Sequence, residues 1–489
     1  MGKKNQVLKN ILFVIIIVFL TISFTKKTID IDMFFSIKLG ENVTKYGLSD
    51  VDTLTYHNNL RYVNVRYLYN ILVYKIYNTY NFNGIYLFAI ICNIINFNLI
   101  FYIIKNLTNK NSNVAFIFTV ISCFLSRKFL YARTINLSLT IFLIEFYSLK
   151  RIIETNKKRY YLIMLILPIL LVNIHGSLFL IFFVFYIPYI VEFILSIFDK
   201  TKEMSLIKNI DLTIYKKIVF LMLINFLEGL ISPFGIIPYI LPFYVIFGKS
   251  IVFITELQLA KKTAFFICII SFFLSIIFYT EKEKTNNLFY VILLVVLALI
   301  IQRAYYYVTT IQIIVLAILF NNYLNNSENN ILILLRQKQN IIICIVILFS
   351  VLFGSWNFKK NLYSDYINKY FFPVDATKYL LENVDLSTKR LFNGFNSGSY
   401  LEFNNIKTFM DSRSEIFESY YNDTTILKDY YDACVTGEKD YKQFIKQYNF
   451  DILLVDKSFN LYTKIEEEDN NNLKTLYEDE RFIIYEKYE

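Results

Sequence analysis

The chain is poor in the residues that build disulfide frameworks and metal centres. Its 489 residues include two histidines, one tryptophan and five cysteines. Four cysteines lie inside apolar runs, and Cys434 stands alone in the last quarter of the chain. No intradomain disulfide can form there, and no cysteine spacing matches a metal site. The cysteines are therefore interpreted as small buried hydrophobic residues.

Charged residues are also scarce. They make up 18% of the chain, whereas a soluble chain carries about a quarter. Residues 1–355 carry 33 Lys and Arg against 16 Asp and Glu, and residues 356–489 carry 17 against 24. The basic excess lies in the apolar part of the chain, where it indicates membrane topology rather than a nucleic-acid interface. We therefore expect no nucleic-acid partner.

Long apolar runs separated by short polar segments dominate the sequence. Hydrophobic residues make up 56% of it and the mean hydropathy is +0.44. A helix needs about twenty apolar residues to cross ~30 Å of hydrocarbon, and lipid offers free backbone groups no partner. The pattern predicts a polytopic α-helical membrane protein with about 11 transmembrane helices. One ends near Phe24, and the others lie near 84–104, 113–126, 135–149, 160–174, 177–198, 217–232, 263–279, 287–301, 304–320 and 339–355.

Basic loops orient these predicted spans. The first apolar stretch follows Lys3, Lys4 and Lys9 and lacks a small-residue cleavage site, which predicts a retained anchor. With this end in the cytoplasm, the basic clusters at 150–151 and 157–159 fall in inner loops, as the positive-inside rule requires. An odd number of spans then places the C-terminal domain outside. We expect a multi-pass plasma-membrane protein with a cytoplasmic N-terminus and an extracytoplasmic C-terminal domain.

Two domains are expected. A transmembrane domain would comprise residues 1–355, with a large extracytoplasmic loop at 25–83 and an interfacial helix at 63–77. A C-terminal α/β soluble domain would comprise residues 356–489. It has no glycine-rich phosphate loop and no nucleophile elbow. Its helices are expected at 374–382 and 440–447, and its strands at 390–392, 400–403, 408–410, 451–455 and 481–485.

Unusual polar residues at span ends gather on the predicted outer side. That side receives the segments 25–83, 127–134, 173–176, 232–262 and 302–303. The inner loops are basic and otherwise plain. This asymmetry is the main functional indication in the sequence.

The outer segments carry an ordered series of short motifs. They are 32–40 (DMFFSIKLG), Tyr46-Gly47 with 52–56 (DTLTY), 132–134 (ART), 172–177 (VNIHGS), 232–235 (SPFG), 255–258 (TELQ), Arg303, 373–376 (PVDA), 396–401 (NSGSYL) and 411–413 (DSR). In this order, over nearly the whole chain, they resemble the bacterial GT-C-type membrane glycosyltransferases. Phe34 and Phe35 stand where that family has tryptophans, and Arg66 stands where it commonly has an acid. These departures concern the acceptor pocket more than the fold.

The resemblance implies an inverting transfer of a sugar from a polyprenyl-phosphate donor in the membrane lipid. The acceptor would be an envelope glycan, lipid or protein on the outer face. Such a transfer needs a carboxylate to take the acceptor proton and groups that stabilise the leaving phosphate. Asp32 is expected to be the catalytic base, and Asp30 to share its work.

The resemblance also implies a donor-phosphate site. Arg133, His175 and Arg303 are expected to bind the phosphate, since arginine forms bidentate bonds to phosphate. Asn173 and Glu256 are expected to support them. Asp30 and Glu256 are candidate ligands for a divalent cation, Mg or Mn, although the sequence establishes no cofactor.

Each of these residues also has a structural interpretation. Asp30 and Asp32 would cap a helix, His175 would be hydrogen-bonded scaffolding, and the arginines would extend to lipid headgroups. Two other functions stay open. A transporter or flippase of lipid-linked sugars predicts ionisable groups near mid-membrane and repeated halves, and a scaffold for envelope assembly would be non-catalytic. Asp411 and Arg413 are candidates for acceptor contact, with a packing role as the alternative.

Overall fold

The computed structural model describes residues 3–198, 211–247, 262–279, 285–300, 305–326, 330–468 and 472–488. Its contacts divide the chain into two compact units. The first is Met1–Lys27, Ile85–Tyr239 and Ile254–Ser364, and the second is Thr28–Gly84, Ile240–Phe253 and Asp365–Glu489. The first outer segment therefore belongs to the same unit as the C-terminal segment, a grouping that the sequence did not predict.

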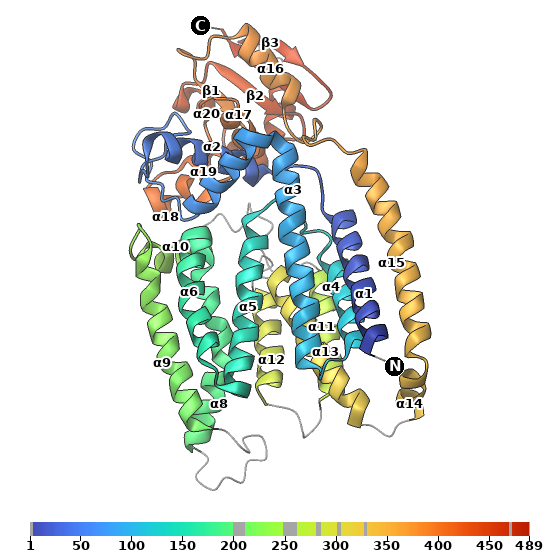
Figure 1. Cartoon of the computed structure of the whole chain (residues 1–489). Helices are drawn as coiled ribbons and strands as arrows, with labels where there is room; N and C mark the ends of the chain where they lie inside the picture. The colour runs from blue at the N-terminus through green and yellow to red at the C-terminus, as the bar shows by residue number, and fades with distance from the viewer. Residues whose placement is uncertain are drawn as a thin grey trace. The chain divides into compact units, whose positions relative to one another are not determined.

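The first unit is helical (Figure 1). Its helices are α1 (Lys3–Phe24), α4 (Ser112–Ser126), α5 (Thr134–Thr155), α6 (Lys158–His175), η1 (Gly176–Leu178), α7 (Phe179–Phe182), η2 (Phe183–Tyr186), α8 (Ile187–Phe198), α9 (Leu212–Glu228), η4 (Gly229–Ile231), α11 (Lys262–Ile277), α12 (Thr285–Ile300), α13 (Tyr305–Asn326), α14 (Asn330–Gln337) and α15 (Gln339–Leu362). Two helices, α3 (Tyr67–Leu107) and α10 (Ile237–Phe247), run from one unit into the other. The predicted interfacial helix and the span after it are joined in α3, which has a non-helical residue at Asn81.

Among the described residues, five helical stretches are long and apolar enough to cross a membrane. They are Lys4–Phe24, Tyr67–Leu107, Lys158–Phe198, Tyr305–Asn326 and Gln339–Leu362. Shorter apolar helices coincide with other predicted spans, so the number of eleven spans stays a prediction.

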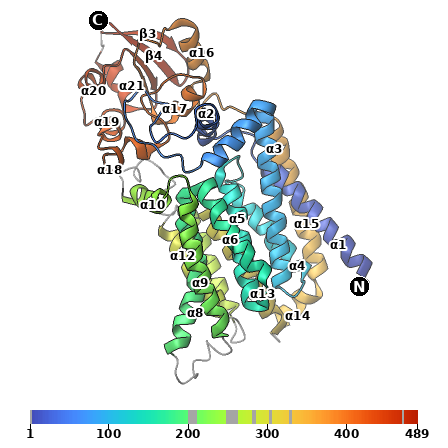
Figure 2. The same ribbon diagram turned by 60° about the vertical axis from the view of Figure 1, so that its left-hand side comes forward.

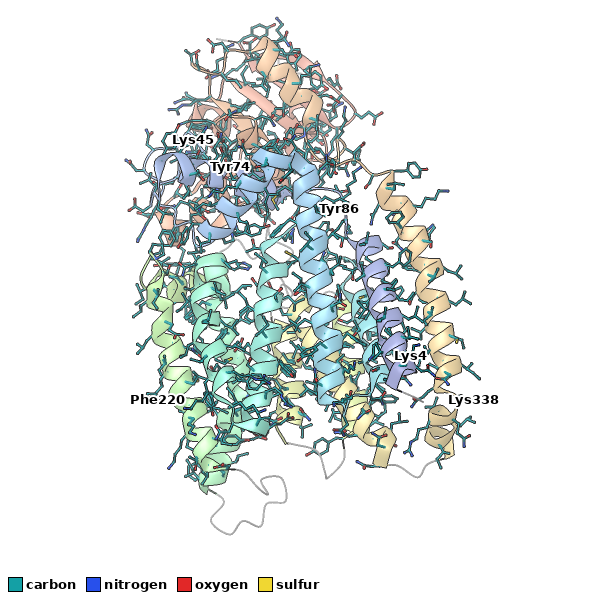
Figure 3. All side chains as sticks on the ribbon, viewed as in Figure 1. Lys4, Lys45, Tyr74, Tyr86, Phe220 and Lys338 are labelled. Carbon is teal, nitrogen blue, oxygen red and sulfur yellow. The ribbon has the colours of Figure 1, made fainter. Side chains whose placement is uncertain are left out.

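The packing of the first unit separates an interior helix from peripheral ones. In the most apolar stretch of α13, 83% is buried inside the structure, whereas in that of α15 only 17% is buried. Figures 1 and 2 show α1 beside α15 and α5 beside α6. Figure 3 labels Phe220, which points outward from α9 and is 65% exposed. Exposed apolar side chains on peripheral helices are expected where lipid replaces water as the solvent.

Polar contacts join several predicted inner loops at one end of this unit. Asn111 Nδ2 donates to Asn321 Oδ1 (2.9 Å). Lys150 Nζ donates to Asn286 Oδ1 and Asn287 Oδ1 (2.5 Å each). Four loops that the alternation of spans assigns to one side are therefore linked in pairs.

A different set of segments meets near the end of α1. Lys26 N donates to Leu130 O (2.8 Å), and Asn361 Nδ2 donates to Thr25 O (3.2 Å). All three segments were predicted on the outer side. The grouping agrees with the predicted alternation, while the side of the membrane on which each end lies stays a prediction.

Lys150 gives a first testable prediction about this packing. It is 5% exposed, and its ammonium serves two amide oxygens. Lys150→Met should destabilise the helical unit by about 1–3 kcal/mol for each amide oxygen left unpaired. Thermal unfolding of the full chain in detergent would measure the loss. Lys157→Met, at an exposed position of the following loop, removes the same charge and should leave the unfolding temperature unchanged; an equal loss there would contradict the assignment.

The second unit contains a four-stranded sheet in the order β1-β2-β4-β3. Strand β1 (Leu391–Asn393) pairs parallel with β2 (Ile452–Asp456), and β4 (Phe482–Lys487) pairs antiparallel with β2 and with β3 (Leu473–Glu478). All five residues of β2 are buried, as expected for a central strand covered on both faces. The helices of this unit are α2 (Ile31–Tyr46), α16 (Val374–Asn383), α17 (Phe395–Phe403), η7 (Ser414–Phe417), α18 (Ser419–Asn422), α19 (Ile426–Tyr430), η8 (Tyr431–Thr436), α20 (Tyr441–Tyr448) and α21 (Asn460–Glu467).

Two predicted strands of the C-terminal segment are wrong. Residues 400–403 lie in α17, whose Gly398 packs against the chain at Met410 so closely that a Cβ would lie 2.0 Å from the Met410 carbonyl oxygen. Residues 408–410 are not a strand. The side chain of Asn393 holds them instead, because Nδ2 donates to Met410 O (2.7 Å) and Oδ1 accepts from Phe409 N (2.8 Å). A side chain thus replaces the ladder that the alternating pattern predicted.

Aromatic packing joins α2 to the C-terminal segment within this unit. Phe34 is fully buried and contacts the rings of Phe82, Phe372 and Tyr400 at centroid distances of 5.0–6.2 Å. Phe35 is 1% exposed. The two phenylalanines at the motif's tryptophan positions are therefore core residues here.

Candidate functional site

Asp30 and Asp32 lie at the start of α2. Asp30 occupies the N-cap position without a side-chain capping bond, and Asp32 lies in the first turn. A carboxylate in a first turn is favoured by the helix dipole. The Asp32 side chain is 28% exposed, and its Oδ2 lies 3.7 Å from Arg66 Nη1. Asp32 is thus a reachable carboxylate beside a cation.

Arg66 was noted in the sequence only as a departure from the motif. Its guanidinium lies 4.9 Å from the ring centroid of Phe35, and its side chain is 16% exposed. The ring and the ion pair together hold the cation beside Asp32. The motif position that commonly carries an acid therefore carries the counter-charge of the candidate base.

His175 ends α6 and is 1% exposed. Its Nδ1 lies 2.8 Å from Ser138 Oγ on α5, so this hydroxyl orients the ring. Asn173 was expected to support His175, but its amide donates to Ile169 O (2.8 Å) in its own helix. Nothing in the sequence near Ser138 indicated a contact with a residue 37 positions away.

Arg133 occupies the N-cap position of α5 and lies 5.6 Å from the ring of Tyr131. Lys26 reaches the same tyrosine, with its Nζ 2.7 Å from the hydroxyl and 4.2 Å from the ring centroid. Ser138 follows Arg133 by five residues, about 7.5 Å along a helix axis. Arg133, Lys26 and the Ser138–His175 pair therefore belong to one end of the helical unit. Lys26 was missed, although it directly follows the first apolar run.

A buried carboxyl on α5 was also missed. Glu145 is fully buried, and neither of its oxygens has a hydrogen-bond partner within the described parts of the chain. Ionisable groups inside membrane spans are functional candidates by default. The sequence signal was present, since Glu145 interrupts the apolar run at 135–149.

Arg303 and Glu256 lie outside the described residues, so their expected roles stay predictions. Asp30 and Asp32 belong to the second unit, and Arg133, Asn173 and His175 to the first. Within the described residues, no three His, Cys, Asp or Glu side chains group in a way that could hold a metal ion. Because Glu256 lies outside the described residues, the expectation that Asp30 and Glu256 bind a divalent cation stays a prediction.

Arg413 and Asp411 form a buried charge cluster in the second unit with Asp52 and Glu402. All four side chains are 0% exposed. Arg413 Nη1 lies 2.7 Å from Asp52 Oδ1, Nη2 contacts Asp411 Oδ2, and Nη2 lies 3.7 Å from Glu402 Oε1. A buried guanidinium so enclosed is unavailable to an acceptor. The geometry favours the packing alternative for Asp411 and Arg413.

Ionisation within this cluster follows from its contacts. Burial raises the pKa of the Glu402 carboxyl well above its usual range, and the neighbouring Asp411 charge adds to this. Burial also acts against the Asp52 charge, but the Arg413 charge and the bonds from Thr55 outweigh it and hold the Asp52 pKa below its ordinary value. The cluster therefore favours the charged form of Asp52 beside Arg413 and disfavours the charged form of Glu402.

Comparison with solved structures identifies the fold. The crystal structure of ArnT from Cupriavidus metallidurans bound to undecaprenyl phosphate matches 99% of this chain and 98% of its own, with a TM-score of 0.57 at 8% identity. The same enzyme in the apo state matches over the same shares, with a TM-score of 0.58 at 8% identity. No protein-family model and no curated protein sequence matches the chain. At 8% identity this likeness shows the fold alone: the chain has an ArnT-like fold over both units.

Proposed function

We propose that the protein transfers a sugar from a polyprenyl-phosphate donor to a cell-envelope acceptor on the outer face of the plasma membrane. The full-length match to ArnT bound to undecaprenyl phosphate carries this proposal. It extends over both units, so it includes the helices and the sheet-containing segment. The clustering of cations and His175 at one end of the helical unit supports it independently.

Asp32 is proposed to act as the general base. As the acceptor hydroxyl oxygen attacks the anomeric carbon, its proton passes to the Asp32 carboxylate. The bond from that carbon to the donor phosphate oxygen breaks, and the polyprenyl phosphate leaves with the electron pair. A single displacement of this kind inverts the anomeric configuration. The exposure of Asp32 and its position at the start of α2 support this role.

The donor phosphate is proposed to bind at the cationic end of the helical unit. Arg133 and Lys26 flank Tyr131 there, and the hydroxyl of Ser138 orients His175. Cationic groups at this position would stabilise the charge that develops on the leaving phosphate. Arg303 is proposed to assist them, with Glu256 and Asn173 in support. A divalent cation on Asp30 and Glu256, if bound, would supply further charge neutralisation.

The decisive experiment uses the purified full chain in lipid nanodiscs with a radiolabelled polyprenyl-phosphate sugar and an envelope glycan extract. Release of undecaprenyl phosphate with label transferred to the extract would support the proposal. Movement of the intact donor across a liposome bilayer without release would support the transporter alternative. Neither reaction, with retention of envelope glycan on the immobilised protein, would support the scaffold alternative.

Arg133 provides a test of the donor site alone. Arg133→Ala should weaken binding of undecaprenyl phosphate about 10–100-fold, since hydrogen bonds to charged groups contribute about 1.5–3 kcal/mol. Binding can be followed by native mass spectrometry of the full chain. The matched control is Arg127→Ala, an exposed arginine of the same loop that donates to Phe124 O (2.9 Å). Equal weakening in both variants would remove Arg133 from the proposed site.

A further inference from the structure

Two adjoining hollows lie in the second unit, apart from Asp32. The first, of about 580 Å³, lies between α2, the segment after it and residues 402–407. The second, of about 560 Å³, is lined by Tyr56, Leu381, Val384 and residues 386–391 and 405–407. Both are lined by Asn405, Ile406 and Lys407, so they meet along this short segment. Each has the volume of a typical small-molecule site.

The end of α2 shapes the first hollow. Lys38, Asn42 and Tyr46 are four residues apart, so they lie along one face of the helix, and all three line the hollow. Gly47 follows with φ 84°, a left-handed conformation that suits glycine and turns the chain back. Asn42 Nδ2 then donates to Thr53 Oγ1 (2.9 Å) on the returning segment. Figure 3 labels Lys45, which pairs with Glu41 on the same helix (2.6 Å) and does not line the hollow.

Two residues lining the first hollow, Asn64 and Glu402, each have one buried polar atom without a hydrogen-bond partner among the described residues. Asn64 is 3% exposed, and its Oδ1 accepts from Asn70 Nδ2 (2.8 Å). Its own Nδ2 has no acceptor among the residues that the structure describes. Buried amide nitrogens are nearly always hydrogen-bonded in native proteins. This nitrogen is itself inaccessible to solvent, so an acceptor in the hollow would reach it only after a shift of the side chain.

The lining is cationic. It includes Lys38, Lys389, Arg390 and Lys407, against the single carboxyl of Glu402. Burial raises the pKa of Glu402, which reduces its negative charge further. Lys38 pairs with Glu41 (2.7 Å) and Lys389 with Glu486 (2.5 Å). Lys407, which both hollows share, is exposed and forms no ion pair within the described part of the chain.

We propose that the two hollows form one groove that binds an acidic glycan, an oligosaccharide bearing carboxylate or phosphate groups. Amide groups and the 83%-exposed Tyr46 suit sugar hydroxyls and sugar faces, and Lys407 suits the anionic group. The groove would hold the acceptor of the sugar transfer. Its assignment as an acceptor site rests on the proposed transferase function. Arg133 and His175, which are proposed to bind the donor phosphate, do not line the groove.

The test is a binding experiment on the full chain in nanodiscs with no donor present. The probes are an oligogalacturonate for carboxylate, a glycerol-phosphate oligomer for phosphate, and a maltooligosaccharide of the same length as the neutral control. Isothermal titration should show binding of at least one acidic probe, weakened by added salt because the contact is partly exposed. The acidic probe that binds identifies the anionic group. Equal binding of the neutral oligosaccharide would overturn the proposal.

Two exposed positions allow variants that should fold normally. Lys407→Gln should weaken binding of the acidic probe about five- to tenfold, and Tyr46→Ala should weaken it by a similar factor. Lys474→Gln removes the same charge from an exposed position on β3, outside both hollows, and should change nothing. If Lys474→Gln weakened binding of the acidic probe as much as Lys407→Gln does, the effect would be one of net charge alone. That result would contradict the proposed groove.

The experiment also separates the groove from the proposed catalysis. Binding that is intact in both the wild type and Asp32→Asn, without any sugar transfer by the wild type, would refute only the transferase. Sugar transfer by the wild type without binding of any acidic probe would refute only the groove.

Discussion

Asp32→Asn should lower kcat for sugar transfer by about 10²–10⁴-fold while leaving donor binding unchanged. A positioned general base contributes about that factor, and an amide cannot take the acceptor proton. The substitution keeps the size of the side chain at the first turn of α2, where Asp32 is 28% exposed. A fold defect is therefore not expected. Single-turnover measurement with labelled donor separates the chemical step from binding and product release.

Two acids serve as comparisons for this variant. Asp50→Asn changes an exposed acid of the same outer segment and should leave turnover intact. Asp30→Asn should cause a smaller loss than Asp32→Asn if Asp30 shares the proton transfer. Full turnover by Asp32→Asn would show that another group is the base, and Glu145 would then be the next carboxyl to test.

Arg413→Met should destabilise the second unit by about 3–5 kcal/mol, the usual cost of removing one partner from a buried ion pair. The substitution leaves Asp52 and Asp411 buried without their counter-charge. Asp52 lies in the first outer segment and Arg413 in the C-terminal segment, so the loss should loosen both. Hydrogen–deuterium exchange of the full chain should show faster exchange in peptides from 48–66 and 391–417, and unchanged exchange in α5 and α6.

The acids of the cluster provide matched controls with opposite expectations. The pKa of Asp52 is lower in the folded state than in the unfolded state. Its charge therefore stabilises the fold at any pH above the unfolded-state pKa, and this stabilisation is lost as the pH falls through the folded-state pKa. Asp52→Asn should therefore be destabilising at neutral pH. The pKa of Glu402 is higher in the folded state than in the unfolded state. Glu402 therefore lowers the stability of the fold as the pH rises above its unfolded-state pKa. Glu402→Gln should be tolerated or stabilising at neutral pH, and a loss as large as that of Arg413→Met would contradict this account.

The regular parts of the fold were accessible from sequence because each depends on local pattern. The apolar runs fall on described helices, and the predicted helix at 374–382 and strand at 451–455 correspond to α16 and β2. The strand predicted at 400–403 failed because a contact distant in sequence decided it. Gly398 allows Met410 to approach α17 closely, and this packing favours a helix at a stretch whose residues alone suit a strand.

The candidate site shows the same division. Asp32, Arg133 and His175 could be selected because each belongs to one of the short motifs that carry the resemblance. Arg66 beside Asp32, Ser138 beside His175 and Lys26 beside Tyr131 could not, because a contact between distant residues leaves no periodic trace in one sequence. The same holds for the groove around Lys407, because its lining joins residues of the first outer segment to residues of the C-terminal segment more than 300 positions later.

The sequence by itself determined that this is a helical membrane protein with an acidic C-terminal segment, because hydropathy and charge act through composition and need no contacts. Only the tertiary structure decided that residues 28–84 pack with that segment and that Asp411 and Arg413 are buried structural charges. It also brought Lys26 to Tyr131 and Ser138 to His175. Burial and pairing are properties of the folded chain, and the free energy of a charge depends on what surrounds it.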